Sequence, residues 1–166
     1  MSGDPTTELT TTRHEAVVEY LEGEGVSYTL VEHESTMTAA AEAAAAHTPP
    51  ADVGKTIVLS DGRRYVMVAI PASRRLDLHK VRNLVDASKQ LQLASEDAIA
   101  AAFPALEVGA VPPFGPLVPA TEVIDRTLVD RPRVLWPGGD HHHSVLVDPR
   151  EVIRLTGAAV ADICED

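Results

Sequence analysis

Two apolar, β-branched runs joined by a tight-turn signal constrain the fold more than any other feature of this chain. The runs cover residues 56–59 and 65–70, and the segment "SDGRR" separates them. Asp-Gly pairs favour the tight turns that join antiparallel strands, so the spacing predicts a β-hairpin. The second strand should end at Pro71, because proline cannot donate a hydrogen bond to a central sheet ladder.

Signals for further helices and strands surround this hairpin. Capping residues predict helices that begin after Thr12, Asp77, Ser95 and Asp148, and the alanine-rich run that ends before Thr48 predicts another. Short strands are expected at 27–33, 121–130, 133–139 and 144–148, with a terminal strand or turn at 158–163. This irregular mixture predicts an α/β (α+β) single domain with a mixed, curved β-sheet flanked by helices.

The length of 166 residues and the single cysteine limit the architecture further. We expect a polar, flexible N-terminal tail at residues 1–11 and one domain over residues 12–166. Cys164 has no partner for an intramolecular disulfide and cannot belong to a multi-thiolate metal site. The chain has no signal-peptide pattern and no apolar stretch long enough to cross a bilayer. The sequence therefore predicts a cytoplasmic protein without membrane contact, and we expect a monomer.

Positive charge is concentrated in one part of an otherwise acidic protein. The formal net charge is -11, yet residues 54–90 hold eight basic and three acidic residues, a local charge of +5. An acidic protein repels a polyanion unless it presents a local positive face. Two interpretations stay open at this point: these side chains are solvated surface charges, or they form a surface that contacts nucleic acid.

The triplet Gly54-Lys55-Thr56 does not fit a phosphate-binding loop. That motif needs a second glycine, separated from the Gly-Lys pair by four residues, in a loop after a strand, and a helix after the Ser/Thr. Here "TPPADV" precedes the triplet and an apolar strand pattern follows it. Lys55 is therefore expected at the start of a β-strand, where its ammonium either meets one phosphate as a point charge or stays solvated.

The His141-His142-His143 run suggests a metal site but supplies too few ligands. Side chains alternate on an extended segment, so only His141 and His143 can point together, and His33 or Asp140 would have to complete the set. We expect no metal and no cofactor. The chain also lacks a Gly-x-Ser-x-Gly elbow, so a hydrolase built on it would use water as its nucleophile.

The segment "GAVPPFG", residues 109–115, has the composition of a loop built for its shape. Glycines let backbone N–H groups approach a ligand closely, and prolines hold such groups in place at low entropic cost. Fixed amide donors suit an oxyanion. The same composition is equally typical of a rigid surface loop.

Taken together, these motifs resemble the YbaK/EbsC family of freestanding aminoacyl-tRNA editing proteins, which are related to the editing domain inserted in bacterial prolyl-tRNA synthetases. The resemblance covers roughly residues 15–163. The matching segments, in order, are "EH" at 32–33, "GKTIVL" at 54–59, "VAIPASRRLDLHKVR" at 68–82, "LASED" at 93–97, "GAVPPFG" at 109–115 and "VLVDPREVIRLT" at 145–156.

The resemblance implies a YbaK-like fold with a pocket for the aminoacylated end of tRNA. It implies a trans-acting aminoacyl-tRNA deacylase in which water hydrolyses the ester of mischarged tRNA, helped by the substrate's ribose hydroxyl. Lys55 and Gly109 are the expected catalytic residues. The expected substrate-binding residues are Val31, His33, Thr56, Ala110, Val111, Pro113, Phe114, Gly115 and Ser144, and Arg74, Arg75 and Lys80 are expected to contact the tRNA backbone.

The expected partner is the acceptor end of aminoacylated tRNA, with an aminoacyl-tRNA synthetase as a further candidate. Three positions depart from the YbaK branch, which has tyrosine at Val31, phenylalanine near Ala40 and aspartate near Ser144. These departures keep an alternative hypothesis open, a non-catalytic module that binds aminoacyl-tRNA or a nucleotide. Metal-dependent hydrolysis at the histidine run is a third.

Overall fold

The computed structural model of the chain describes residues 14–36, 38–85, 90–114 and 121–166. The expected N-terminal tail at residues 1–11, the Thr12 cap and the site residue Gly115 lie outside the described residues.

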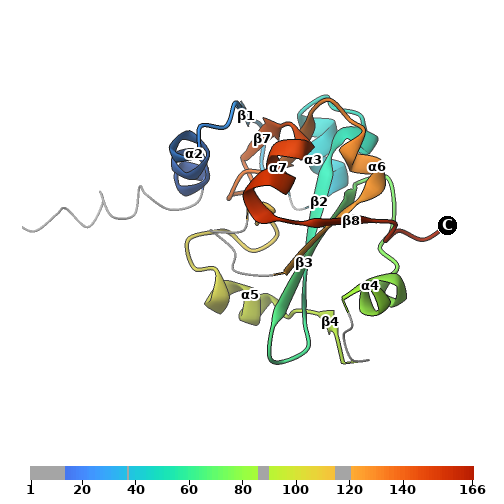
Figure 1. Cartoon of the computed structure of the whole chain (residues 1–166). Helices are drawn as coiled ribbons and strands as arrows, with labels where there is room; N and C mark the ends of the chain where they lie inside the picture. Colours follow the sequence, from blue (N-terminus) through green and yellow to red (C-terminus); the bar gives the residue numbers. More distant parts are fainter. Residues whose placement is uncertain (1–13, 37, 86–89, 115–120) are drawn as a thin grey trace, which may run out of the picture.

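The predicted hairpin forms and crosses the whole molecule (Figure 1). Strands β2 (Gly54–Ser60) and β3 (Tyr65–Pro71) pair antiparallel along their full length. The Asp61 carboxylate accepts hydrogen bonds from the amides of Arg63 and Arg64, at 2.8 and 3.0 Å, and so closes the turn. This is the local bonding that makes Asp-Gly a turn signal.

The strands form two sheets that meet near the start of β2. The five-stranded sheet has the order β4-β2-β3-β5-β8 and the three-stranded sheet the order β1-β7-β6. Pairs β3–β5 and β5–β8 are parallel and all the other pairs are antiparallel. An isolated bridge between Val53 and Leu135 joins the two sheets. The other strands are β1 (Thr29–Glu32), β4 (Gln92–Leu93), β5 (Thr121–Asp125), β6 (Val134–Pro137), β7 (His143–Val147) and β8 (Ala159–Ala161).

Short helices pack around these sheets, as the mixed α/β prediction required. Side chains of Thr38, Asp77, Ser95 and Asp148 accept hydrogen bonds from amides in the first turns of their helices, which confirms the last three as predicted caps. The helices are α2 (His14–Gly23), α3 (Ala39–Ala45), the 3-10 turn η1 (Pro50–Asp52), α4 (Leu78–Leu84), α5 (Glu96–Ala102), α6 (Arg126–Val129) and α7 (Pro149–Thr156).

One predicted strand was wrong over half its length. Residues 121–130 were expected to be extended, but the strand ends at Asp125 and residues Arg126–Val129 form α6. The Asp125 carboxylate accepts a hydrogen bond from the Thr127 amide, at 3.1 Å, and caps this helix. A capping residue at the end of a strand thus outweighs the β-branched residues that follow it.

The core is mostly aliphatic, with Phe103, Phe114 and Trp136 in one cluster, and it lies on both faces of the five-stranded sheet. Met67 and Ile124 face one cluster, and their neighbours Val68 and Val123 face the other, as the two-residue period of a strand requires. Cys164 is buried in the second cluster, where burial and the neighbouring Asp125 raise the pKa of its thiol to about 12. The thiol is therefore inert as a nucleophile at neutral pH.

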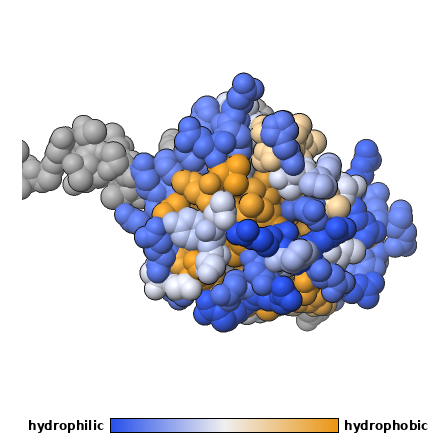
Figure 2. Space-filling view, turned by 90° about the horizontal axis from the view of Figure 1, so that it is seen from above, coloured by the Kyte–Doolittle hydropathy of each residue, from blue (hydrophilic) through white to orange (hydrophobic). Residues whose placement is uncertain are grey.

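One face of the molecule is largely hydrophilic. Figure 2 shows polar side chains around an apolar area on the face seen from above. Among the described residues, the large apolar side chains that are exposed lie on different elements: Leu30 on β1, Leu84 on α4, Leu93 on β4 and Val160 on β8. Within the described part of the chain, every helix is too short or too polar to cross a membrane.

Gly54 is required at the junction of the two sheets because the ring of Trp136 lies directly on its backbone. A Cβ atom on Gly54 would come within 2.3 and 2.4 Å of two ring atoms of Trp136. Trp136 is fully buried and donates its indole hydrogen bond to the Val147 carbonyl, at 3.2 Å, so it has little freedom to move. The glycine of the Gly-Lys-Thr triplet therefore has a packing role.

We predict that Gly54→Ala lowers the free energy of unfolding by about 1–3 kcal/mol, the usual cost of overpacking a core. Chemical denaturation of the purified protein measures this. The matched control is Gly23→Ala at the end of α2, where a Cβ meets nothing within 4 Å. Equal stabilities for Gly54→Ala and the parent would show that Trp136 does not lock this junction.

Candidate active site

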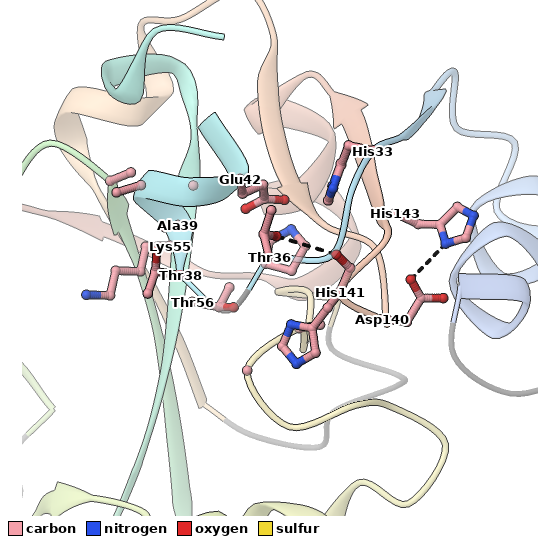
Figure 3. A pocket seen from close by; sticks show the side chains of 16 residues that line it. His33, Thr36, Thr38, Ala39, Glu42, Lys55, Thr56, Asp140, His141 and His143 are labelled. Atoms are coloured by element: carbon pink, nitrogen blue, oxygen red, sulfur yellow. Dashed lines mark hydrogen bonds and ion pairs between the residues drawn. The ribbon is translucent and has the colours of Figure 1, made fainter. Parts of the chain in front are cut away.

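A cavity of about 390 Å³ opens where the two sheets meet. Its walls come from the segment after β1, the first turns of α3, the start of β2, the loop at 109–110 and the turn between β6 and β7. In Figure 3, Lys55 extends on the side away from His143 and Asp140, and Glu42 and His33 lie on the side of α3. This size is typical of pockets for small ligands.

Lys55 and Thr56, the second and third residues of β2, line this pocket. The Lys55 side chain is exposed, and its position at the mouth of the strand is the one predicted from the sequence. The Thr56 hydroxyl donates a hydrogen bond to the Val111 carbonyl and ties the strand to the predicted loop. Strand β2 thus fixes the Lys55 backbone at the pocket, while the exposed side chain extends to the side away from His143 and Asp140 (Figure 3).

The loop at Gly109 has the geometry that a backbone donor site needs. Gly109 has a φ of +87°, and a Cβ there would lie 3.1 Å from Cε1 of His141. The Ala110 amide donates to the Glu107 carbonyl, at 2.9 Å, and the Gly139 amide donates to the Ala110 carbonyl, at 3.0 Å. Among the described residues the Gly109 amide has no partner, which leaves it free to donate to a ligand oxygen.

Five of the predicted site residues line the pocket: His33, Lys55, Thr56, Gly109 and Ala110.

Four others lie outside the pocket wall, which differs from the expectation that their side chains contact substrate. Val111, Pro113 and Phe114 are buried, and the Phe114 ring packs in the core 6.1 Å from that of Tyr20. Val31 pairs with β7 in the three-stranded sheet and packs against a small apolar cluster. The segment is irregular, as predicted, but it is not a surface loop, because its apolar side chains are buried.

Ser144 also lies outside the pocket wall, yet it bonds to two residues that form it. It is fully buried on β7 and its hydroxyl donates a hydrogen bond to Oε2 of Glu42. On its other side, Nε2 of His33 lies 2.8 Å from the Ser144 oxygen. Ser144 thus links α3 to the segment that follows β1.

Glu42 is the pocket residue that the sequence analysis missed. It sits in an alanine-rich helix with 6% of its surface exposed. Burial raises the pKa of its carboxyl to about 7, while the hydrogen bond from Ser144 acts in the opposite direction. A signal was present, because Glu42 lies three residues after Ala39 and beside Ala43, on the face of the helix that packs inward. A carboxylate on that face is unusual unless it is bonded.

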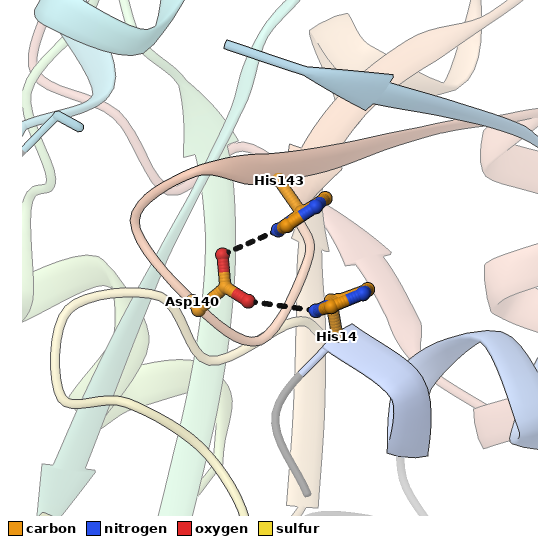
Figure 4. Close-up of side chains that lie close together, drawn as sticks. All are labelled: His14, Asp140 and His143. Carbon is orange, nitrogen blue, oxygen red and sulfur yellow. Dashed lines mark hydrogen bonds and ion pairs between the residues drawn. The ribbon is translucent and has the colours of Figure 1, made fainter. Parts of the chain in front are cut away.

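A second polar cluster ties α2 to the turn between β6 and β7 (Figure 4). The Asp140 carboxylate lies 2.9 Å from Nδ1 of His14 and 2.7 Å from Nδ1 of His143, and the two imidazole rings stack at 3.7 Å. Burial opposes ionisation of Asp140, but hydrogen bonds from His143, the His142 amide and His14 outweigh it and lower its pKa. The cluster therefore fixes a turn that also supplies His141 to the pocket.

This cluster is also where the described residues bring three potential metal-ligand atoms together, within 4.8 Å of one another. Asp140 and His143 were considered in the sequence, but the third member is His14 and not His141 or His33. His141 lies against Glu107, with 3.5 Å between Nε2 and Oε1, and His33 bonds to Ser144 instead. The distances from the Asp140 carboxylate to Nδ1 of His14 and Nδ1 of His143 are those of hydrogen bonds.

The three basic residues expected to contact tRNA lie beyond one rim of the pocket, after Ala72. Arg75 is exposed, and Arg74 donates to the Glu165 carbonyl, at 3.1 Å. The Lys80 ammonium is held by the carboxylates of Asp162 and Asp166, each at 3.2 Å. Arg75 is therefore the least engaged cation of the three.

Comparisons with known proteins relate this chain to an editing domain. The family model for the aminoacyl-tRNA editing domain matches residues 33–155. A solved structure described as a candidate trans-editing enzyme for prolyl-tRNA synthetase is 26% identical, with a TM-score of 0.78, and the match covers 99% of this chain and 100% of that one. The search of curated proteins found no significant match.

Two further solved structures share the fold closely. Hypothetical protein APE2540 is 29% identical with a TM-score of 0.80, over 90% of this chain and 99% of that one. A scaffold from a study of epitope grafting by computational design is 28% identical with a TM-score of 0.81, over 92% and 97%. The family match spans most of the chain and all walls of the pocket, which confirms the YbaK-type resemblance: the chain belongs to the aminoacyl-tRNA editing domain family.

Proposed function

We propose that this protein is a trans-acting aminoacyl-tRNA deacylase, which hydrolyses the ester of mischarged tRNA with water as the nucleophile. Membership of the editing family supports a role in editing. The observation that supports the reaction is the presence of Lys55 and Gly109 among the residues that line one pocket. We place the activity in the domain predicted at residues 12–166, acting as a cytoplasmic monomer on the acceptor end of tRNA.

Hydrolysis of this ester needs few catalytic groups from the protein. An aminoacyl ester with a vicinal ribose hydroxyl is already reactive, and that hydroxyl can help to orient the attacking water. Lys55 would hold the terminal phosphate or the ribose as a point charge. The Gly109 amide would donate to the carbonyl oxygen as negative charge develops there, which is where fixed donors contribute most.

Selection between amino acids would then depend on the shape of the pocket. A volume of about 390 Å³ has to hold the amino acid together with part of the ribose. One methylene more or less in such a pocket changes the free energy of binding by about 1–3 kcal/mol. Ala39 and Ala40, which line the wall formed by α3, leave room that larger residues would fill.

The test is a panel of end-labelled mischarged tRNAs incubated with the protein. We predict that at least one loses its amino acid much faster with the protein than without it, and that Lys55→Ala slows this by at least tenfold. The matched control is Arg63→Ala, which removes one exposed cation at the hairpin turn, roughly 20 Å from Lys55.

The proposal fails if no member of the panel is hydrolysed, or if Lys55→Ala is as fast as Arg63→Ala. Tight, Lys55-dependent and salt-sensitive binding without turnover would instead establish the non-catalytic binding module.

A second prediction concerns the tRNA contacts. We expect Arg75→Ala to weaken tRNA binding and to reduce the slope of log K against log salt by nearly one, as loss of one phosphate contact does. Lys80→Ala should change the slope less, because Asp162 and Asp166 already neutralise that ammonium. Binding isotherms at several salt concentrations measure both, and an unchanged slope in Arg75→Ala would remove this side chain from the interface.

A further inference from the structure

We propose that Glu42, Ser144 and His33 form a hydrogen-bonded relay that holds one shared proton, and that Glu42 is the group that accepts the proton of the attacking water. The inference rests on the deacylase function proposed above and adds to it the proton acceptor, which neither Lys55 nor the Gly109 amide supplies.

The three side chains are joined without a gap. Oε2 of Glu42 accepts the Ser144 hydroxyl, and the Ser144 oxygen lies 2.8 Å from Nε2 of His33. Nδ1 of His33 lies 2.8 Å from the carbonyl oxygen of Glu34. They come from three elements, α3, β7 and the segment after β1, so the relay exists only in the folded pocket.

Counting donors shows how many protons the relay holds. A carbonyl oxygen can only accept, so Nδ1 of His33 must carry a hydrogen. The Ser144 hydroxyl has one hydrogen and lies between two potential acceptors. If it donates to Glu42, then His33 must donate to it and is an imidazolium. If Glu42 is protonated and donates to Ser144, then the hydroxyl donates to a neutral His33.

These two arrangements contain the same number of protons and differ only in where the mobile one lies. A relay with one proton fewer would place two lone pairs face to face, between Ser144 and His33, and is disfavoured. When the buried Glu42 carboxyl is ionised, His33 is therefore protonated and its positive charge balances that of the carboxylate. This lets Glu42 act as a base in a site where burial alone would keep it protonated.

The position of the relay fits the reaction. Glu42 and His33 both line the pocket, while Ser144 is fully buried behind them. Figure 3 shows the Glu42 carboxylate and the His33 ring close together on one side of the cavity. The other titratable side chains that line the pocket are Lys55, Asp140, His141 and His143. Both oxygens of Asp140 already accept hydrogen bonds from imidazoles, so it is a poorer base than Glu42.

The step balances as an ester hydrolysis. The water oxygen forms a bond to the ester carbonyl carbon, and one water proton passes to the Glu42 carboxylate. The bond between that carbon and the ribose oxygen then breaks, and the ribose oxygen takes the proton back from Glu42. The products are the free amino acid and tRNA with a free hydroxyl. Ser144 and His33 stay bonded throughout and are positioning residues for Glu42.

The first experiment observes the shared proton without any substrate. The His33 ring nitrogens and the Glu42 carboxyl carbon are followed by NMR across a pH titration of the whole protein. We expect one common midpoint at both sites in the parent, because a coupled pair titrates as a unit. Ser144→Ala should separate the two midpoints and raise that of Glu42. Independent titration of His33 and Glu42 in the parent overturns the relay.

The second experiment tests whether Glu42 is the base. It measures kcat/KM as a function of pH, with the mischarged tRNA that the protein hydrolyses fastest in the panel as the substrate. The parent should show a limb that rises with pH at the midpoint seen by NMR. Glu42→Gln should lower kcat/KM by about 10²–10⁴-fold and abolish this limb. Ser144→Ala and His33→Asn should move the limb to higher pH. Glu96→Gln, an exposed carboxylate on α5, is the matched control and should match the parent.

The possible outcomes distinguish failure of the role of Glu42 from failure of the proposed deacylase function. Hydrolysis with an unchanged limb in Glu42→Gln overturns the role of Glu42, leaves the deacylase in place and points to His141 or His143 as the base. No hydrolysis across the panel overturns the function and the role of Glu42 together. His33→Asn replaces a half-buried side chain, so the test stands even if Ser144→Ala does not fold.

Discussion

The contact of Trp136 with the bare backbone of Gly54 is the interaction on which the pocket depends. It lies where β2 meets β6, next to the bridge between Val53 and Leu135 that joins the two sheets. Because Gly54 precedes Lys55, the same contact fixes the point from which the Lys55 side chain extends. The Lys55 backbone is therefore positioned by core packing, and the resemblance of the triplet to a phosphate loop has no structural basis.

The other walls of the pocket are held by polar bonds between segments far apart in the sequence. Thr56 bonds to the loop at Val111, Asp140 bonds to His14 and His143, and Ser144 joins Glu42 to His33. Such networks are stable only when their members are satisfied together. These bonds hold the pocket walls together, and among the described residues they leave the Lys55 ammonium and the Gly109 amide without a partner.

Local signals in the sequence were enough for most elements of the fold. The Asp-Gly turn fixed the hairpin, and Asp77, Ser95 and Asp148 marked helix starts correctly because caps act within one turn. The division of strands into two sheets and the Asp140 cluster depend on contacts across more than a hundred residues, which no local pattern encodes. Glu42 was missed for a different reason. Its neighbours are alanines, and this alanine-rich pattern predicts a helix but gives no sign that the carboxylate has a role.

The central claim is that this pocket hydrolyses an aminoacyl ester with water. The most direct measurement is deacylation of a susceptible mischarged tRNA in water enriched in heavy oxygen, with mass analysis of the released amino acid. The account predicts one heavy oxygen atom in the amino acid's carboxyl group, at a rate that requires Lys55. Release of the amino acid without the label, or no release above the rate without protein, would contradict it.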